Sequence, residues 1–362
     1  MLPAKVELRR GWTTGTCATA AAAAAYEALL IGAFPEFVTV ELPRGGTAAL
    51  AIATARLDPG SATAGVIKDA GDDPDVTHGA EIRASVCPGP AGSGVAFRAG
   101  EGVGTVTLPG LPVPVGEPAI NPGPRAMIRT AIAAVAARHG AAGDVVVTVS
   151  VPGGEALAAK TLNGRLGILG GLSILGTTGV VVPFSCAAWI HSIHRGVDVA
   201  RAAGLTHLAA ATGSTSEAAV KALYGLPEAA LIDMGDFVGG TLKYLRRHPV
   251  PRLTIAGGFA KLVKLAQGAM FLHSSKSRVD MAALAGVLET LEAPADLVAE
   301  AVSANTAAQV LGTATAHGLP LADAIAARAR AVAVAALAAE TAIEVMVFDR
   351  QGVLAGRAAF GD

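Results

Sequence analysis

The sequence predicts two domains. An α+β domain over residues 1–162 is followed, over residues 163–362, by a three-layer α/β domain with a mostly parallel sheet and Ala-rich C-terminal helices. Length supports this number, because the chain has 362 residues and a domain usually has roughly 100–200. The pattern changes near residue 163, from successive strands to strands that alternate with helices. Hydrophobic residues make up 52% of the chain but aromatic residues only 4%, so the core must consist of small aliphatic side chains.

The first domain is expected to run strand, helix, several strands, helix, strand. Threonines and a glycine ahead of the run Ala18–Ala25 predict a helix start, because hydroxyls accept hydrogen bonds from the free N–H groups of a first turn. Six prolines in residues 109–124 predict an extended loop, since proline donates no hydrogen bond. Two hairpins are expected, 37–42 with 48–55 and 80–86 with 94–98. The other expected elements are the strands Lys5–Arg9, Ala64–Lys68 and Val145–Val151 and the helix Arg125–Arg138.

The second domain contains three units in which a strand leads through glycine into a helix. This alternation predicts a parallel sheet with helices on both faces. A capping-box spacing, Ser214 to Glu217, predicts the start of the first of these helices. The units are Thr206–Ala211 with Ser216–Tyr224, Ala229–Met234 with Gly239–Arg247, and Leu253–Ala256 with Ala260–Gln267; helices over 280–341 and a hairpin, Ile343–Phe348 with Val353–Arg357, follow.

Charge and cysteine content exclude several classes of protein. Lys and Arg number 28 and Asp and Glu 29, so there is no basic excess to bind nucleic acid. Cys17, Cys87 and Cys186 are scattered, which argues against a zinc site or a disulfide framework and fits a reducing compartment. The charged N-terminus lacks the apolar stretch of a signal peptide, and five glycines and a proline make Leu166–Ile190 a poor membrane helix. We expect a cytoplasmic protein without membrane or nucleic-acid partners.

A glycine-rich segment, residues 167–179, is the most distinctive feature of the sequence. Glycine lets a backbone approach a ligand closely and adopt positive φ. The segment has no GxGxxG spacing, and in a phosphate-loop alignment Thr177 stands where the lysine should be. It could cradle an adenosine-bearing ligand without a triphosphate, or form a tight structural turn between domains. The candidate binding residues are Gly167, Gly170, Gly171, Ser173, Gly176, Thr177, Thr178 and Gly179.

An acidic turn, residues 68–79, carries four carboxylates and one imidazole. Such a cluster could bind a hard cation or supply an acid–base pair. It does not match a calcium loop, because His78 stands at the sixth position from Asp73, where glycine is required. A solvated Asp-rich turn is the simpler alternative. The candidate catalytic residues are Asp69, Asp72, Asp73 and His78, and no metal is expected.

Two further places could bind ligands. Gly213 and Asp236 follow predicted parallel strands, and open α/β sheets bind ligands at the carboxyl ends of their strands. Lys276 and Arg278 could hold carboxylates, although a solvated loop also explains their surroundings.

Several segments, taken in order, resemble the CbiD family, the cobalt-precorrin-5B C-1 methyltransferases of anaerobic cobalamin biosynthesis. Each match is weak evidence alone, but the ordered set is specific and covers the chain from residue 11 to about 280. The matching segments are 11–18, 68–79, 102–110, 116–122 and 160–179, with weaker matches at 212–217, 235–237 and 261–274.

The resemblance implies that the α/β domain is Rossmann-like. It also implies a methyl transfer from S-adenosylmethionine to C-1 of a cobalt-bearing polycarboxylate tetrapyrrole, giving cobalt-precorrin-6A. The donor would be held by residues 167–179 together with Gly213 and Asp236. One carboxylate of the acidic turn would orient the donor or take a macrocycle proton, with His78 as the alternative base. The expected substrate contacts are Thr14, Thr16, Lys261, Lys276 and Arg278.

Other interpretations remain open from the sequence. The chain could be a non-catalytic tetrapyrrole- or nucleotide-binding component of a biosynthetic complex. An NAD-type oxidoreductase is disfavoured by the missing dinucleotide fingerprint. The chain could also form a homo-oligomer or contact neighbouring pathway enzymes transiently.

Overall fold

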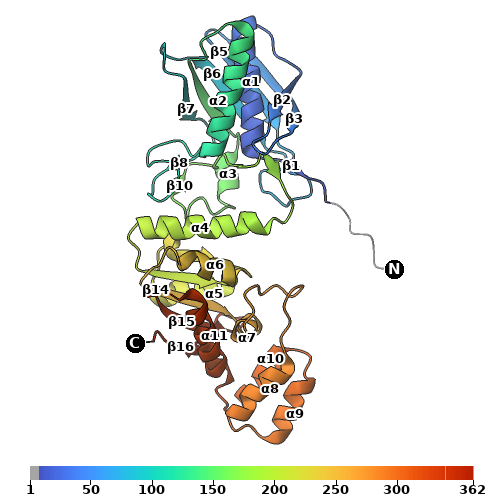
Figure 1. Cartoon of the computed structure of the whole chain (residues 1–362), viewed down its shortest axis with the longest axis vertical. Helices are drawn as coiled ribbons and strands as arrows, with labels where there is room; N and C mark the ends of the chain where they lie inside the picture. Colours follow the sequence, from blue (N-terminus) through green and yellow to red (C-terminus); the bar gives the residue numbers. More distant parts are fainter. Residues whose placement is uncertain (1–7, 339, 362) are drawn as a thin grey trace, which may run out of the picture. The chain divides into compact units, whose positions relative to one another are not determined.

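The computed structural model describes residues 8–338 and 340–361. The chain divides into two compact units, Met1–Cys186 and Ala187–Asp362 (Figure 1). The glycine-rich segment, which we expected to open the second domain, therefore lies in the first unit. It does so because its backbone pairs there, Leu169 with Thr105 in a short ladder and Gly179 with the start of a helix.

A five-stranded sheet forms the centre of the first unit. Its order is β4-β5-β6-β9-β7, antiparallel except for the parallel pair β7 and β9. The predicted hairpin between 80–86 and 94–98 is wrong, because β9 lies between these two strands. The valine-rich β9 is the more buried strand and takes the inner position, whereas the half-exposed β7 takes the edge. The strands are β4 (Thr54–Asp58), β5 (Ser61–Ile67), β6 (Glu81–Pro88), β7 (Val95–Ala99) and β9 (Val145–Ser150).

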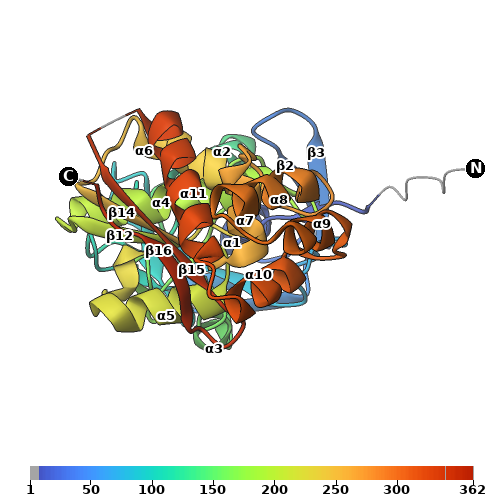
Figure 2. The same cartoon turned by 90° about the horizontal axis from the view of Figure 1, so that it is seen from below.

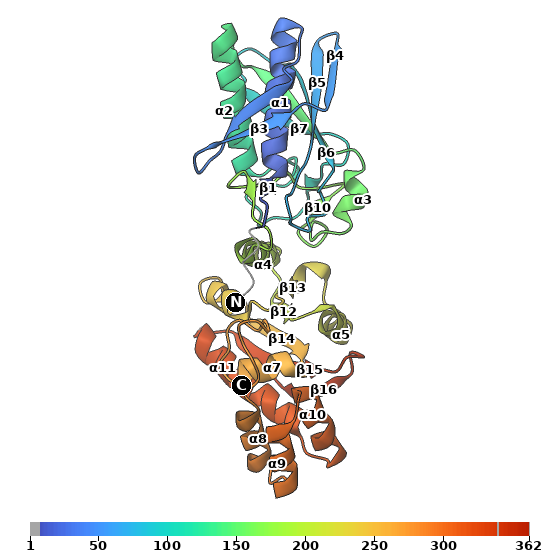
Figure 3. The same cartoon turned by 90° about the vertical axis from the view of Figure 1, so that its right-hand side faces the viewer.

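Two helices, α1 (Thr14–Ile31) and α2 (Pro122–His139), lie side by side in the first unit, and α1 also packs on β5 and β6 (Figures 1 and 3). The run Ala18–Ala25 is fully buried, so small side chains let α1 lie close to its neighbours. By length and composition α1 is the one helix in the described ranges that could span a membrane, yet 78% of that window is buried inside the protein.

Small elements complete the first unit. The hairpin of β2 (Phe37–Glu41) and β3 (Thr47–Ala51) confirms one prediction. The expected strand Lys5–Arg9 lies mostly outside the described residues. The remaining elements are the pair β1 (Gly11–Trp12) and β11 (Val180–Val181), the pair β8 (Thr105–Val106) and β10 (Ile168–Leu169), and α3 (Gly154–Ala158).

The second unit contains a mixed sheet in the order β13-β12-β14-β15-β16. The first four strands are mutually parallel and β16 is antiparallel, as the predicted final hairpin requires. The strands are β12 (His207–Ala211), β13 (Leu231–Asp233), β14 (Arg252–Gly258), β15 (Ala342–Phe348) and β16 (Leu354–Ala358).

Helices cover both faces of this sheet (Figure 2). Along β12, Ala209 and Ala211 pack on the face that carries α5, whereas Leu208 and Ala210 pack into the larger core on the other face. That alternation is the period of two that a strand buried on both sides requires. The helices are α4 (Cys186–Ala202), α5 (Ser214–Tyr224), α6 (Val238–Leu245), α7 (Phe259–Ala266), α8 (Met281–Thr290), α9 (Ala295–Ser303), α10 (Ala307–Ala316) and α11 (Leu321–Leu337), with a 3-10 turn at Glu228–Ala230.

The capping box predicted at the start of α5 is wrong. The N-cap is Gly213, which has no side chain to bond the first turn, and Ser214 is already helical. Ser216 instead donates its hydroxyl to the Gly213 carbonyl, 2.9 Å away.

Candidate functional site

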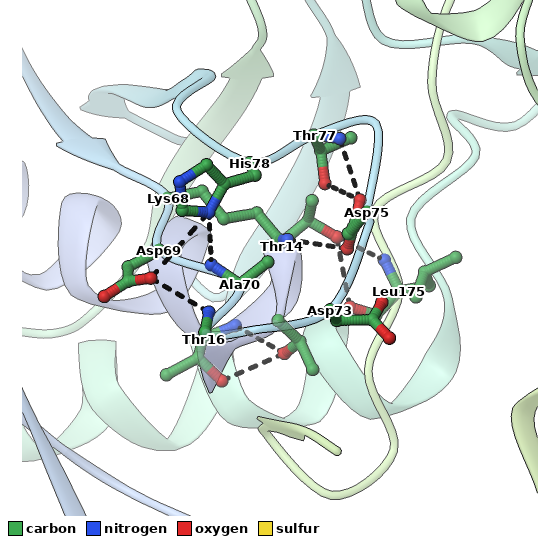
Figure 4. A network of polar contacts seen from close by, with 12 residues as sticks. Thr14, Thr16, Lys68, Asp69, Ala70, Asp73, Asp75, Thr77, His78 and Leu175 are labelled. Carbon is green, nitrogen blue, oxygen red and sulfur yellow. Dashed lines mark hydrogen bonds and ion pairs between the residues drawn. The ribbon is translucent and has the colours of Figure 1, made fainter. Parts of the chain in front are cut away.

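The N-terminus of α1 meets the glycine-rich segment through buried hydroxyls. Thr14 Oγ1 donates to the Leu175 carbonyl at 3.1 Å and accepts from the Leu175 N–H at 3.0 Å. Thr16 Oγ1 donates to the Gly179 carbonyl at 2.7 Å (Figure 4 shows both threonines). Thr14 is 3% exposed and Thr16 fully buried, so both hydroxyls hold the segment in place, and their expected substrate contacts stay a prediction.

The glycines of residues 167–179 are used mainly for packing. A Cβ on Gly171 would lie 2.3 Å from the Gly102 carbonyl, and one on Gly176 would lie 2.2 Å from the hydroxyl oxygen of Thr13. Gly167 and Gly179 have positive φ and pack against leucine side chains, whereas at Gly170 an added Cβ would meet open space. This packing favours the structural alternative for the segment.

The acidic turn begins with a closed ion pair. Lys68 is only 1% exposed, and its Nζ lies 2.7 Å from Asp75 Oδ2. Asp75 Oδ1 accepts hydrogen bonds from the N–H and the hydroxyl of Thr77, at 2.8 and 2.6 Å. Burial alone would raise the pKa of Asp75, but the hydrogen bonds from Lys68 and Thr77 outweigh it and the pKa lies below its usual value. This pair therefore stabilises the turn.

Asp69 is held in its ionised form. Its carboxylate accepts two hydrogen bonds from the Arg9 guanidinium, and the Nη2–Oδ1 distance is 3.0 Å. It also accepts from the Gly71 N–H at 2.9 Å. The Arg9 hydrogen bond, followed by the one from Gly71, lowers the pKa of Asp69 to about 2. A carboxylate this acidic is a weak proton acceptor near neutral pH, so Asp69 suits a positioning role better than a basic one.

The other candidates of the turn also bond the backbone (Figure 4). Asp72 accepts from the Arg9 N–H at 2.6 Å, and Asp73 accepts from the Phe184 N–H at 2.8 Å. His78 Nδ1 accepts from the Ala70 N–H at 3.1 Å. A neutral ring that accepts at Nδ1 carries its proton on Nε2, so the exposed nitrogen of His78 donates and is poorly suited to act as a base.

A second group of predicted residues meets at the carboxyl edge of the second unit's sheet. The helix after β12 covers one face and the helix after β14 covers the other, and these two strands are neighbours. The strand order is therefore 2-1-3-4-5 within the unit, with its switch point between β12 and β14. In open α/β sheets a crevice forms at such a point and binds ligands.

Glycines open this edge to a ligand. Gly213 and Gly258 are the N-caps of α5 and α7, neither helix has a side-chain cap, and both glycines are exposed. An added Cβ at either would meet nothing within 4 Å. The sequence pattern already places Gly258 at a strand end equivalent to that of Asp236, and in the structure it is the last residue of β14.

Lys261 and Asp236 supply charge at the same edge. Lys261 Nζ donates to the Thr212 carbonyl at 2.7 Å and lies 3.1 Å from Asp236 Oδ1. That carboxylate oxygen is buried, yet no hydrogen-bond donor in the described chain is aligned with it. The Asp236 side chain as a whole is 21% exposed, so its carboxylate can accept a hydrogen bond from a bound hydroxyl or amine. The structure thus brings together Gly213, Asp236 and Lys261.

The predicted residues fall into two sets. The threonines, the acidic turn and residues 167–179 belong to the first unit, and Gly213, Asp236, Lys261, Lys276 and Arg278 belong to the second. Within the described residues, no group of three or more His, Cys, Asp or Glu side chains could hold a metal ion.

Comparison with known proteins identifies the family. A model described as CbiD matches residues 2–183, and one described as the CbiD C-terminal domain matches residues 271–359. A protein named cobalt-precorrin-5B C(1)-methyltransferase from a Bradyrhizobium species is 62% identical over 98% of this chain and 95% of its own length. One of the same name from Paramagnetospirillum magneticum is 61% identical over 97% and 98%. The crystal structure of a cobalamin biosynthesis protein, cbiD, from Archaeoglobus fulgidus covers 71% of this chain and 79% of its own at 31% identity, with a TM-score of 0.40. The chain belongs to the CbiD family.

Proposed function

We propose that this protein methylates C-1 of cobalt-precorrin-5B, giving cobalt-precorrin-6A in cobalamin biosynthesis, with S-adenosylmethionine as the donor. The observation that carries the proposal is the near-full-length identity to relatives named for that C(1) methylation. When bound, S-adenosylmethionine supplies an electrophilic methyl whose bond pair leaves with sulfur while C-1 provides the new pair. The protein's part is then to hold the acceptor carbon about 3–3.5 Å from the methyl and in line with the breaking bond.

The proposed donor site is the carboxyl edge of the second unit, which we take to be a Rossmann-like three-layer domain. Two bare helix N-termini, at Gly213 and Gly258, can receive the donor's carboxylate, because unpaired N–H groups and the helix dipole favour an anion. The Asp236 side chain is 21% exposed, so its carboxylate can accept from a ribose hydroxyl or from the amino group. Lys261 holds Asp236 in place.

We propose a catalytic role for only two of the four candidate residues in the acidic turn. Because Asp69 is strongly acidic and His78 donates rather than accepts, Asp72 and Asp73 are the better candidates for taking a macrocycle proton. Asp72→Asn and Asp73→Asn each keep an amide oxygen for the backbone contact. Loss of turnover with an unchanged melting temperature would support this part, and full turnover in both variants would contradict it.

A steric block tests the donor site. Gly258→Val should fold normally, because its φ is −73° and a Cβ meets open space, but the new side chain would fill the edge. We expect calorimetry to show at least a tenfold weaker affinity for S-adenosylhomocysteine. Gly164→Val is the matched control, since a Cβ there also meets open space.

Two outcomes would count against the proposal. If folded Gly258→Val protein binds S-adenosylhomocysteine as tightly as the wild type does, the carboxyl edge is not the donor site. Residues 167–179 would then be the remaining candidate. Binding of donor and acceptor without turnover by the wild type would favour a non-catalytic component. The cytoplasmic location and any oligomer or contact with pathway enzymes stay predictions.

A further inference from the structure

Aromatic side chains form a row beside the carboxyl edge of the second unit. Ring centroids of Trp189 and Phe237 are 6.3 Å apart, those of Phe237 and Phe271 are 5.0 Å apart, and those of Phe271 and His273 are 6.1 Å apart. Trp189 is 44% exposed although it is large and apolar. In a chain with few aromatic residues, four rings gather at one place, with Trp189 and His273 exposed and Phe237 and Phe271 half-buried.

The row is fixed to the proposed donor site. Trp189 Nε1 donates to the Asp233 carbonyl at 3.1 Å, and the indole lies against Gly235, whose added Cβ would be 3.4 Å from it. The Leu272 N–H donates to the Asp236 carbonyl at 2.9 Å. The buried Lys264 Nζ donates to the Leu272 carbonyl at 2.8 Å. The rings are therefore held by the same loop that carries Asp236.

Positive charge follows the row directly. Residues 271–279 contain Lys276 and Arg278, both exposed, and no carboxylate. The next acid, Asp280, is already used, because its Oδ1 accepts from the Ala283 N–H at 3.0 Å and caps α8. A ring surface bordered by exposed cations suits a ligand with a flat apolar centre and an anionic rim.

We propose that this row, Trp189, Phe237, Phe271 and His273, is the platform on which the tetrapyrrole acceptor lies, with its carboxylates on Lys276 and Arg278. The proposal rests on the proposed function and adds the acceptor's place. The macrocycle packs its face against Trp189 and Phe271, and Arg278 pairs with rim carboxylates as a two-pronged donor. Because the rings adjoin Asp236, the acceptor lies next to the donor site within one unit.

Binding of cobyrinic acid, a cobalt corrin with free carboxylates, tests the platform by equilibrium dialysis. We expect Phe271→Ala and Trp189→Ala each to weaken binding about tenfold, as loss of a stacking partner does. Arg278→Ala should weaken it by a similar factor and reduce its dependence on salt. The matched controls are Phe37→Ala, a 58% exposed ring of β2, and Arg44→Ala, in an exposed turn, and both should bind as the wild type does.

A second readout keeps the test valid if one variant folds poorly. Trp12 and Trp189 are the chain's two tryptophans, so Trp12→Phe leaves Trp189 as the sole indole emitter. The fluorescence of Trp189 should be quenched over the same range of cobyrinic acid concentration that saturates binding in the dialysis experiment. Corrin affinity unchanged by Phe271→Ala, Trp189→Ala and Arg278→Ala would overturn the platform.

The same set of variants separates this proposal from the proposed function. Phe271→Ala should bind S-adenosylhomocysteine as the wild type does, because the ring does not contact the open glycines. A wild type that binds neither ligand would contradict the proposed function itself. Self-association of the wild type that Phe271→Ala abolishes would assign the row to contact between copies and overturn the platform.

Discussion

In residues 167–179 of the first unit, most glycines lie where a side chain would collide with backbone or with neighbouring side chains. At the carboxyl edge of the second unit, Gly213 and Gly258 lie where a side chain would meet open space. Both regions are rich in glycine. In the first region Gly170 alone among the glycines has such open space, whereas both glycines of the second region have the free approach that ligand binding requires. Glycine content therefore marks close approach, and the structure decides whether a ligand or the protein itself approaches.

Valine at these positions should separate the two regions most strongly. Gly171→Val would drive a side chain into the Gly102 carbonyl, and we expect a loss of about 3 kcal/mol or more in the free energy of unfolding. Gly213→Val, at an extended φ of 174° but at a helix N-cap where valine is disfavoured, should cost only about 1 kcal/mol. Chemical denaturation measures both. Equal losses would remove the distinction between the regions.

The second-largest difference is expected between the lysine–aspartate pairs of the two units, in the stability lost when the lysine is replaced. Lys68→Met leaves Asp75 without its buried partner, and we expect a loss of about 2–3 kcal/mol, below the full cost of a buried pair because Asp75 is 25% exposed. Lys261→Met, at a side chain 36% exposed, should cost less than about 1 kcal/mol. Adding Asp75→Asn to Lys68→Met should restore part of the loss. A larger loss for Lys261→Met would reverse the comparison.

Acid should weaken the first unit through Asp69. Its pKa is lowered in the folded protein from 3.8 to about 2, so the stabilisation is present above about pH 4 and is lost as the pH falls towards 2. The effect should be small because Asp69 is 45% exposed. Melting temperatures between pH 5 and 2 should fall less steeply in Asp69→Asn than in the wild type. Arg9→Gln should move the Asp69 titration, followed by NMR, to higher pH, and an unmoved titration would contradict the assigned cause.

The smallest effect is expected at His78. Asparagine can place an amide oxygen where Nδ1 accepts from the Ala70 N–H, so His78→Asn should keep the turn intact. We expect its turnover to stay within about twofold of the wild type, because the Nδ1 lone pair is already bonded to the Ala70 N–H and Nε2 carries the proton. A loss of a hundredfold with an unchanged melting temperature would restore histidine to catalysis.

Local patterns predicted the elements well. The threonines ahead of the alanine run identify the start of α1, and Thr13 is indeed its cap, with the hydroxyl accepting from the Thr16 N–H at 3.2 Å. The strand–glycine–helix units became β12, β13 and β14 with their helices. These features depend on neighbours in sequence, so the sequence carries them.

Long-range pairing could not be predicted in the same way. The sequence does not show that β9 separates β6 from β7, because strand order depends on burial in the whole sheet. Nor does it show that Leu175 bonds Thr14, which ties the glycine-rich segment to the first unit. Trp189, Phe237 and Phe271 are far apart along the chain, so no sequence motif predicts that their rings lie in a row.

The buried alanine helix has a consequence for how the chain is made. Synthesis completes α1 at residue 31, whereas its partner α2 is complete only at residue 139. Until first β5 and β6 and finally α2 have been made, the nascent polypeptide presents an 18-residue apolar helix, hydrophobic enough to resemble a membrane anchor, without its full set of partners. The ribosome-bound intermediate is therefore the stage most exposed to aggregation and to mistaken recognition by targeting factors, and we expect it to depend on a protective chaperone.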